Sequence, residues 1–467
     1  MTNIDENSKN TVFINSKGTP ENLVDDKSLR KKAIQIYGLT GIVNTNNTCY
    51  MNSAIQAFSH NYPLTSYLFE KKNEILETLI KNGRKILKDT NAFKIETEKS
   101  IVPLLLRNKI QDPNYDPKMM TEEEINIILN NTITGQLIKL LEHMWKKNCT
   151  VVPTSFKKIF SEARDKFFFG YEQHDAEEAY SCILQKMQEE LAEEKNIKFK
   201  ITKPSVQEFL QFKNDITMKI NNSQNIEEKK QLLELYKKKK REMFNESLTI
   251  EAFREMKKYY GTAYSKITEI FSGFLHSSLT CPDPNCGYSS NKFDPFLHLS
   301  LSIPNPFKYG PILTIQDCMH DYFKEETLDE KNLWMCEGCN KKVCGIKKLQ
   351  LWTGPPILVI QLKRFGNTRN SKDNRLVKYP TEHFDISSVM SSVQFEPSKC
   401  FKYRLQCVIN HTGSLNSGHY YTYCLDEDSG KWYEFNDHLV SEIDKNRIVT
   451  NTAYLLFYIR EDMIINL

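Results

Sequence analysis

The chain has 467 residues and a formal net charge of +4, which gives no reason to expect nucleic acid or an anionic membrane as a partner. Hydrophobic residues make up 40% and charged residues 26% of the sequence, as is usual for a globular protein with a substantial core. The most apolar short run, residues 355–360, is too short to span a bilayer, and residues 1–10 lack the features of a secretory signal. We therefore expect a cytoplasmic or nuclear protein without a membrane partner.

The first half of the chain is predicted to be mainly helical. Residues 1–37 are rich in Asn, Lys, Ser and Asp without apolar periodicity, and we interpret them as a mobile arm. From residue 38 to 192, apolar residues recur at helical spacing, as in residues 133–145 and 175–191. Residues 193–262 are rich in Lys and Glu with broken helical periodicity, which indicates an insertion rather than a domain with its own core.

Two interpretations of this insertion stay open. It binds a regulator, or it is a solvated helical segment, which we favour. Its basic run at residues 237–241 (KKKKR) is either a nuclear address or, as we favour, the solvated face of a helix.

Short alternating or apolar runs follow one another from residue 271 onward and indicate an antiparallel sheet. The expected strands are residues 298–303, 356–364, 403–409, 419–425, 431–436 and 453–460. In the third of these, alternation predicts Tyr403, Leu405, Cys407 and Ile409 on one face. Helices first and sheet after give an α+β fold.

Cys49 is the candidate nucleophile because it lies where a polar loop runs into a helix. Asn47 or Thr48 is a suitable N-cap, and apolar residues then recur at four- and three-residue intervals. Cys49 is therefore expected in the first turn, where unpaired N–H groups and the helix dipole favour a thiolate. A thiolate is the form that attacks an amide carbonyl. The alternative is a small buried cysteine at a helix start.

His419 is the candidate base, at the start of an expected strand. Pairing His419 with Asn436 centres the hairpin in the turn DEDSG, so Asn436 can hydrogen-bond the imidazole from the same face. Asp437 should point to the other face and is the weaker candidate. The sequence thus predicts a Cys, His, Asn constellation in which Asn436 orients the ring. His411 and His438 are alternatives that strand geometry places less well.

Two close cysteine pairs predict a metal site. Cys281 with Cys286, and Cys336 with Cys339, have spacings C-x₄-C and C-x₂-C that are typical of knuckles that bind Zn²⁺. Four thiolates leave no open position, so the zinc would be structural. Cys344 is an alternative to Cys339, and four unrelated thiols are the other alternative. The remaining cysteines among the twelve are sparse, which favours a reducing compartment.

Together these segments resemble the ubiquitin-specific protease family, the papain-like deubiquitinases, over nearly all of residues 38–460. The segments that carry the resemblance are residues 44–53 (NTNNTCYMNS, the cysteine box), 170–178 (GYEQHDAEE, the Gln-Gln-Asp box), 271–286 and 293–304 (the fingers and the following strand), 358–365 (LVIQLKRF, the palm strand), 411–423 (the histidine box), 432–437 (WYEFND, the third triad residue) and 453–460 (AYLLFYIR, the closing strand). They follow the family's order.

The resemblance implies the family's hand-like fold. One catalytic domain, residues 38–462, would comprise a thumb at 38–192, the insertion at 193–262, mainly fingers with zinc knuckles at 263–350, and a palm at 351–462.

It also implies hydrolysis of isopeptide or peptide bonds at the C-terminal glycine of ubiquitin, by a catalytic domain that is monomeric and needs no catalytic cofactor. Its partners would be ubiquitin and ubiquitinated proteins. Cys49 would attack, His419 would act as general base and acid, and Asn44 would complete the oxyanion hole. The residues implied in binding the ubiquitin tail are Asp175 and Glu178 (with its arginines), Gly418 and Tyr420 (lining the channel for its last glycines), Gln173 and His411.

The sequence departs from the family pattern at three places. Asn46 replaces a glycine, which is tolerable if the position needs a positive φ, because Asn adopts that conformation best. His174 replaces the second Gln of its box, which changes contacts beneath the tail. The insertion has no counterpart.

Two rival functions remain at this point. A catalytically dead ubiquitin-binding scaffold is disfavoured because all the candidate catalytic residues are intact. A hydrolase for a ubiquitin-like modifier is disfavoured because an acidic pair suits a tail that carries arginines.

Overall fold

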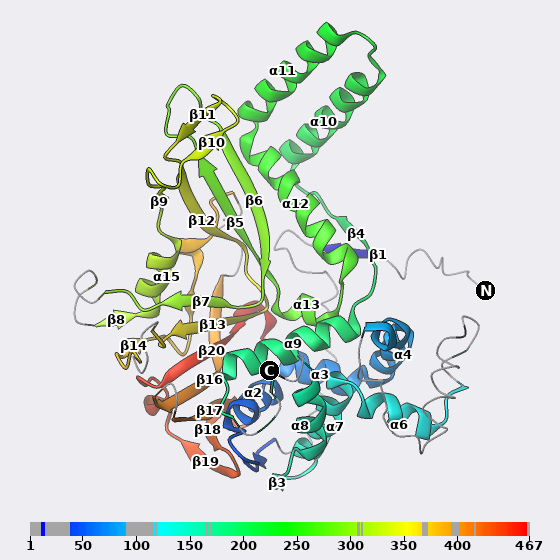
Figure 1. Cartoon of the computed structure of the whole chain (residues 1–467), viewed down its shortest axis with the longest axis vertical. Coiled ribbons are helices and arrows are strands. Elements are labelled where there is room, and N and C mark those ends of the chain that lie inside the picture. Colours follow the sequence, from blue (N-terminus) through cyan, green and yellow to red (C-terminus); the bar gives the residue numbers. More distant parts are fainter. Residues whose placement is uncertain are drawn as a thin grey trace.

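The structure, a computed structural model, joins a helical part to a large sheet from which a smaller sheet projects (Figure 1). It describes residues 11–14, 38–89, 112, 116, 119–163, 167–168, 170, 172–305, 309, 312–366, 372–393, 401–414 and 417–464. Within these ranges no helix has the length and apolarity needed to cross a membrane. The predicted α+β order, helices first and sheet after, is confirmed.

The helical part surrounds one central helix, α2. Its helices are α2 (Cys49–Ser59), α3 (Tyr62–Glu70), α4 (Lys72–Asp89), α6 (Glu122–Asn130), α7 (Ile133–Lys146), α8 (Thr154–Glu162) and α9 (Ala176–Leu191). The helices α7 and α9 confirm the two predicted from periodicity. Every residue of α2 is buried, because the helix is enclosed between α9 and the large sheet. A short parallel pair, β2 (Gly41–Ile42) and β3 (Thr150–Val151), lies beside it.

The large sheet has eight strands and forms the palm. Their order is β19 (Leu439–Ile443), β18 (Lys431–Asn436), β17 (Gly418–Asp426), β16 (Lys402–Gly413), β20 (Ala453–Arg460), β13 (Ile357–Lys363) and β7 (Leu299–Ser302), with β15 (Phe384–Asp385) also on β16. All six predicted strands are present. The sheet is antiparallel as expected except at one edge, where β7 runs parallel to β13. The long connection between these two strands allows the crossover that parallel pairing needs.

Both faces of the central palm strands β13, β16 and β20 are buried. Residues such as Val359, Ile409 and Phe457 pack in the core that includes α2 and α9. Their neighbours pack in a second core on the opposite face, against α15 (Ile315–Phe323). The prediction of four alternating residues on one face of β16 is wrong, because a bulge between Leu405 and Cys407 moves Tyr403 and Leu405 into the second core.

The smaller sheet forms the fingers. Its order is β6 (Ser289–Phe296), β5 (Gly273–Thr280), β12 (Ile346–Thr353) and β9 (Glu326–Thr327), and the hairpin of β10 (Trp334–Cys336) and β11 (Lys341–Val343) lies at its tip. The remaining short elements are α13 (Lys266–Phe271), β8 (Leu313–Thr314), β14 (Val377–Lys378) and the 3₁₀ turns Ser387–Val389, Lys445–Arg447 and Glu461–Met463.

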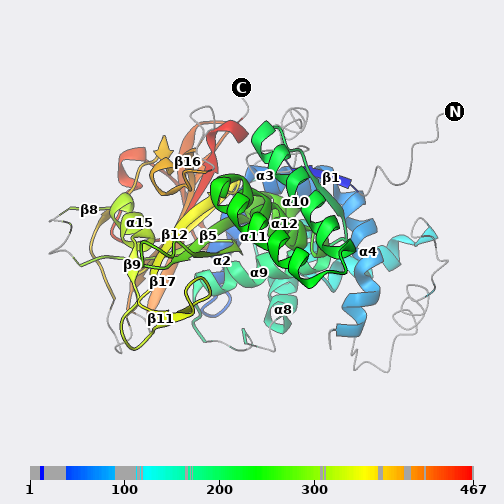
Figure 2. The same ribbon diagram turned by 90° about the horizontal axis from the view of Figure 1, so that it is seen from above.

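The insertion consists of β4 (Asn196–Phe199) and three long helices, α10 (Pro204–Asn222), α11 (Ile226–Glu242) and α12 (Phe244–Thr262). The helix α12 packs on β6, while α10 and α11 form a hairpin that extends away from the palm (Figure 1). Seen from above, the three helices overlie the middle of the molecule (Figure 2). None of the residues of α11 is buried, so the basic run lies on a solvated helix as favoured.

The N-terminal arm is not wholly without structure. Residues Thr11–Ile14 form β1, which pairs in parallel with β4 of the insertion. The expectation of a mobile arm is wrong for these residues, because the partner strand comes from a segment far along the chain and cannot be read from local composition. The rest of residues 1–37 lies outside the described ranges.

Candidate active site

Cys49 is the first residue of α2 and is 4% exposed. Thr48 stands at the N-cap, but its side chain makes no capping bond to the helix. Its Oγ1 instead accepts from the Thr45 N–H at 2.9 Å, and its own N–H donates to Asn44 Oδ1 at 2.9 Å. The prediction that Cys49 lies in the first turn is confirmed. Thr48 serves to close the preceding loop around Asn44.

This loop needs two left-handed residues to reach the helix. Asn46 has φ +62° and Asn47 has φ +57°, a conformation that Asn tolerates better than other non-glycine side chains. The expectation for Asn46 is confirmed. The Lys157 ammonium of α8 donates to the Thr45 carbonyl at 2.6 Å and holds the loop from outside.

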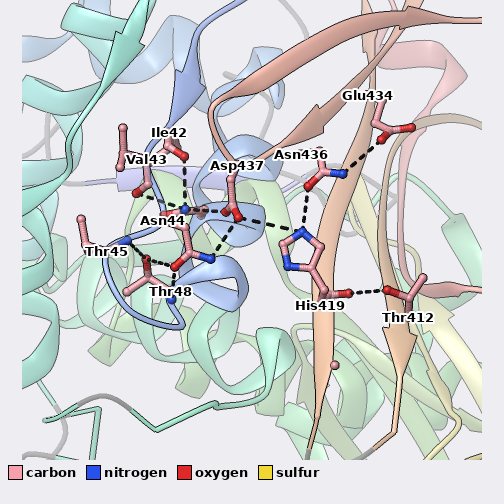
Figure 3. A network of polar contacts seen from close by, with 12 residues as sticks. Ile42, Val43, Asn44, Thr45, Thr48, Thr412, His419, Glu434, Asn436 and Asp437 are labelled. Atoms are coloured by element: carbon pink, nitrogen blue, oxygen red, sulfur yellow. Dashed lines mark hydrogen bonds and ion pairs between the residues drawn. The ribbon is translucent and has the colours of Figure 1, made fainter.

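His419 lies in β17, and its imidazole is held by Asn436 (Figure 3). Nε2 of the ring lies 2.8 Å from Asn436 Oδ1, which can only accept, so Nε2 carries the proton. The Cys49 side chain is the largest influence on the pKa of His419 and, together with the Asn436 bond and against the opposing effect of burial, raises it to about 9. Since Nε2 is occupied by Asn436, Nδ1 is the nitrogen left to exchange a proton.

The predicted hairpin register is wrong by two residues. Thr422 pairs with Phe435 and Tyr423 with Glu434, so the next pair would set Asn436 opposite Tyr421, diagonal to His419. A four-residue turn closes the hairpin, because Gly430 has φ +67° and its N–H donates to the Asp426 carbonyl. A shift of two keeps each side chain on its face, and Asn436 therefore still reaches the imidazole.

Asp437 was expected to point away from His419, and this expectation is wrong. Its carboxylate Oδ2 lies 3.9 Å from His419 Nε2 (Figure 3). Strand alternation ends here because Asp437 has φ +51°, which turns the side chain back toward the ring. The same oxygen accepts from Asn44 Nδ2 at 3.0 Å.

The two alternative histidines are poorly suited to act as the base. His411 is 3% exposed, and burial lowers its pKa to about 4. It packs against Phe365 and Tyr420 rather than against the nucleophile. His438 is exposed on the turn between β18 and β19.

Four of the residues implied in tail binding lie together. Gln173 bridges the backbone of Gly418, accepting from its N–H at 3.2 Å and donating to its carbonyl at 3.3 Å. His411 pairs with Tyr420 across β16 and β17, with ring centroids 4.5 Å apart. Gly418 must lack a side chain, because a Cβ there would lie 2.1 Å from His411 Nε2.

Asp175 is held from within the chain. It caps α9 by accepting from the Glu177 N–H at 2.7 Å, and the Tyr454 hydroxyl donates to it at 2.6 Å. Burial is the largest cause that raises the pKa of Asp175 to about 6. Glu178 lies half-buried in the first turn of the same helix.

His174 joins an aromatic group beside the nucleophile. Its ring centroid lies 5.2 Å from that of Tyr50 and 5.1 Å from that of Phe168. Burial lowers the pKa of His174, so the ring is neutral at physiological pH and packs as an aromatic side chain.

The four predicted metal-binding cysteines converge at the tip of the fingers. Their sulfurs all lie within 4.8 Å of one another, with 3.9 Å between Cys281 and Cys339 and 3.6 Å between Cys286 and Cys336. A tetrahedral zinc with Zn–S bonds of about 2.3 Å sets its sulfurs about 3.8 Å apart. The donor set therefore fits a four-coordinate metal. Cys344 lies outside this group of thiols.

Each knuckle is closed by a left-handed residue after its second cysteine. Gly287 has φ +58° and Asn340 has φ +55°. The Asn340 N–H donates to the Cys336 carbonyl at 2.8 Å, and a Cβ on Gly338 would lie 2.7 Å from the Cys286 sulfur. The backbone thus wraps closely around the space between the four sulfurs.

Sequence reasoning missed Asn52 and Tyr454. Asn52 donates to Asp437 at 2.8 Å and Tyr454 to Asp175. A signal existed for Asn52, since an amide on the buried face of a helix needs a polar partner.

Comparisons with known proteins identify the family of the chain. The sequence model of the family described as ubiquitin carboxyl-terminal hydrolase matches residues 40–458. A probable ubiquitin carboxyl-terminal hydrolase, R319 of Acanthamoeba polyphaga mimivirus, is 55% identical over 97% of this chain and 96% of its own length. Human ubiquitin carboxyl-terminal hydrolase 2 is 29% identical over 90% of this chain, which spans 55% of that protein.

Solved structures share the fold. The Ubp8/Sgf11/Sus1/Sgf73 module of SAGA bound to ubiquitin aldehyde matches with a TM-score of 0.53 at 21% identity, over 91% of this chain and 70% of that one. A variant of the same module bound to monoubiquitin matches with a TM-score of 0.54 at 20% identity, over 93% of this chain and 72% of that one.

Proposed function

Because the chain belongs to the ubiquitin carboxyl-terminal hydrolase family, we propose that it releases ubiquitin from proteins by hydrolysing the bond at ubiquitin's C-terminal glycine. One observation carries the residue roles. Cys49 stands at the start of a helix, and its side chain is the largest cause that raises the pKa of the His419 imidazole, whose Nε2 is held by Asn436 at 2.8 Å. This is the arrangement of an activated cysteine nucleophile with an oriented base.

In the first half of the reaction, the Cys49 thiolate attacks the carbonyl carbon of the terminal glycine. The carbonyl oxygen becomes an oxyanion, which accepts from the Asn44 amide and from N–H groups at the start of α2. An amide NH₂ has two donors, so Asn44 can serve the oxyanion while it holds Asp437. The His419 imidazolium then gives its proton to the leaving amine, and a thioester remains on Cys49.

In the second half, the neutral imidazole takes a proton from a water that attacks the thioester. The same oxyanion donors stabilise the second tetrahedral intermediate, which expels the Cys49 thiolate and leaves a free carboxylate on ubiquitin. His419 has then regained its proton, so the catalyst is restored. The net change is the addition of one water, and these steps need no catalytic cofactor.

The tail-binding roles rest on the acidic side chains of this region and on the close packing around Gly418. Asp175 already accepts two hydrogen bonds, yet a carboxylate has about four lone-pair sites, so it can still receive a guanidinium beside Glu178. Gly418 and Tyr420 would line the channel for the last glycines of the tail, and Gly418 itself has no room for a side chain beside His411. Gln173 must release Gly418 if the tail pairs with that backbone.

An electrophilic ubiquitin probe tests the proposal. Ubiquitin with a reactive group at its C-terminus is expected to form one adduct with the wild type and none with Cys49→Ala, because only the Cys49 thiolate meets that carbon. The matched control is Cys149→Ala, which removes a partly buried thiol held against Thr40 and should still react. The measurement is intact-protein mass spectrometry.

Failure of the wild type to react would favour a ubiquitin-binding scaffold. An adduct that survives Cys49→Ala would sink the assignment of the nucleophile. A stronger reaction with a probe built on a ubiquitin-like modifier would change the proposed substrate.

The thiol cluster at the tip of the fingers is proposed to hold a structural zinc. Four sulfur donors suit Zn²⁺, and closed coordination leaves no position for a substrate. Bound there, the metal would join the loop after β5 to the hairpin of β10 and β11.

Removal of one ligand tests the zinc site. Cys336→Ser is expected to reduce zinc from about one per chain to near zero and to lower the thermal midpoint by at least about 5 °C, since metal binding stabilises only the folded state. Elemental analysis and thermal unfolding measure both quantities. The matched control is Cys344→Ser, outside the cluster, which should retain the metal. Full zinc in Cys336→Ser would contradict the assignment.

A further inference from the structure

Asn52 is a polar residue in an unusual place. It lies on α2, three residues after Cys49, and is 2% exposed. Burying an amide is costly unless a partner compensates it. Its Nδ2 donates to Asp437 Oδ1 at 2.8 Å, whereas its distances to the carbonyls of Ile42 and Val43 are 3.4 Å and 3.5 Å. The carboxylate is therefore its main partner.

Asp437 connects this amide to the rest of the site. Its Oδ1 accepts from Asn52, and its Oδ2 accepts from Asn44 at 3.0 Å and faces His419 Nε2 at 3.9 Å. The side chain is only 12% exposed, so water competes little for these bonds. The Asp437 carbonyl also accepts from the Ile42 N–H at 2.8 Å, which fixes the turn itself.

The reacting groups come from three separate segments: Cys49 from α2, Asn44 from the preceding loop, and His419 from β17. The Asp437 carboxylate touches the last two. Asn52 is the side chain that ties this carboxylate back to the nucleophile's own helix.

We propose that Asn52 is a positioning residue of the hydrolase, which acts through Asp437 to hold the Asn44 donor and the His419 base in register with Cys49. This inference rests on the function proposed above. Without the Asn52 bond, the Asp437 carboxylate is free to rotate, and Asn44 and His419 lose their fixed partner. Displacement of catalytic groups by about 1 Å can slow a reaction about 100-fold.

A polarity swap separates this role from a purely structural one. Asn52→Asp sets two carboxylates against each other and is expected to lower kcat at least about 100-fold. Adding Asp437→Asn restores a hydrogen bond with donor and acceptor exchanged, and kcat of the double variant should be at least about 10-fold higher than that of Asn52→Asp alone. If Asn52 only served the two backbone carbonyls, the second substitution would give no recovery.

A truncation cycle gives the second readout. Asn52→Ala should lower kcat by about 10- to 100-fold with KM changed less than about 3-fold. Combined with Asp437→Asn, it should cause little further fall in kcat. The substrate is ubiquitin with a fluorogenic C-terminal amide. Gln56→Ala is the matched control: it removes a buried amide of the same helix that donates to the Thr40 carbonyl at 2.8 Å, and its kcat should stay near that of the wild type.

The inference would be overturned if Asn52→Ala and Asp437→Asn lowered kcat independently, so that the double variant showed the product of the two effects. It would also be overturned if Gln56→Ala lowered kcat as much as Asn52→Ala. Asn52→Ser replaces Asn52→Ala in the same cycle if the alanine variant does not fold. The wild type's reaction with the electrophilic probe is scored separately, so a failure of this inference is distinguishable from a failure of the proposed function.

Discussion

His419→Gln is expected to lower kcat/KM for hydrolysis at ubiquitin's C-terminal glycine by at least about 1,000-fold. Glutamine can still hydrogen-bond Asn436, which lies 2.8 Å from the imidazole, and it fits a similar volume. It cannot carry a proton to the leaving amine or take one from water. Binding of ubiquitin should change little, because the substitution leaves the surrounding strands intact. Steady-state kinetics and a binding isotherm for ubiquitin measure the two effects.

The matched control is His438→Gln, which changes an exposed histidine on the following turn and should alter kcat/KM less than about 2-fold. An inactive His438→Gln together with an active His419→Gln would assign the role of catalytic base to His438 instead of His419. Equal, partial losses in both variants would contradict a single base.

The palm and the zinc knuckles were predictable because their signals are local. Strands such as β13 and β20 are buried on both faces, so they appear as continuous apolar runs bounded by turn residues. The knuckles need only two closely spaced cysteine pairs. The signal for the start of α2 was equally local, since a run of Asn and Thr before apolar residues at helical spacing predicts both the loop and the helix.

The errors came from properties that composition does not carry. Periodicity fixes the face of a strand but not its register, so the turn closed by Gly430 moved the hairpin by two residues without moving Asn436 off its face. The direction of Asp437 depends on one left-handed φ, and the bulge in β16 is likewise a backbone choice.

Of the two residues beside the imidazole, Asp437 should contribute more to catalysis than Asn436. Asn436 contributes one hydrogen bond to the ring. Asp437 places a negative charge 3.9 Å from Nε2 and also holds the Asn44 donor at 3.0 Å. Had Asp437 pointed to the other face of the sheet, Asn436 alone would orient the base.

Asp437→Ala is therefore expected to lower kcat about 100- to 1,000-fold, against about 10-fold for Asn436→Ala. Both residues raise the pKa of His419 to about 9, after the larger effect of Cys49. The imidazolium is present below that pH and is lost above it, so the alkaline limb of the kcat/KM profile lies near pH 9 and moves to lower pH in either variant. The measurement is kcat and kcat/KM between about pH 6 and about pH 10 for all three proteins.

Only Asp437→Ala should also weaken the oxyanion donor Asn44. Adding Asn44→Ala to Asp437→Ala should therefore lower kcat little further, whereas adding it to Asn436→Ala should lower kcat by the product of the two single effects. A near wild-type kcat in Asp437→Ala beside an inactive Asn436→Ala would show that neither the charge nor the Asn44 contact assists the reaction. In that case the hydrogen bond at 2.8 Å would carry the orientation of His419 by itself.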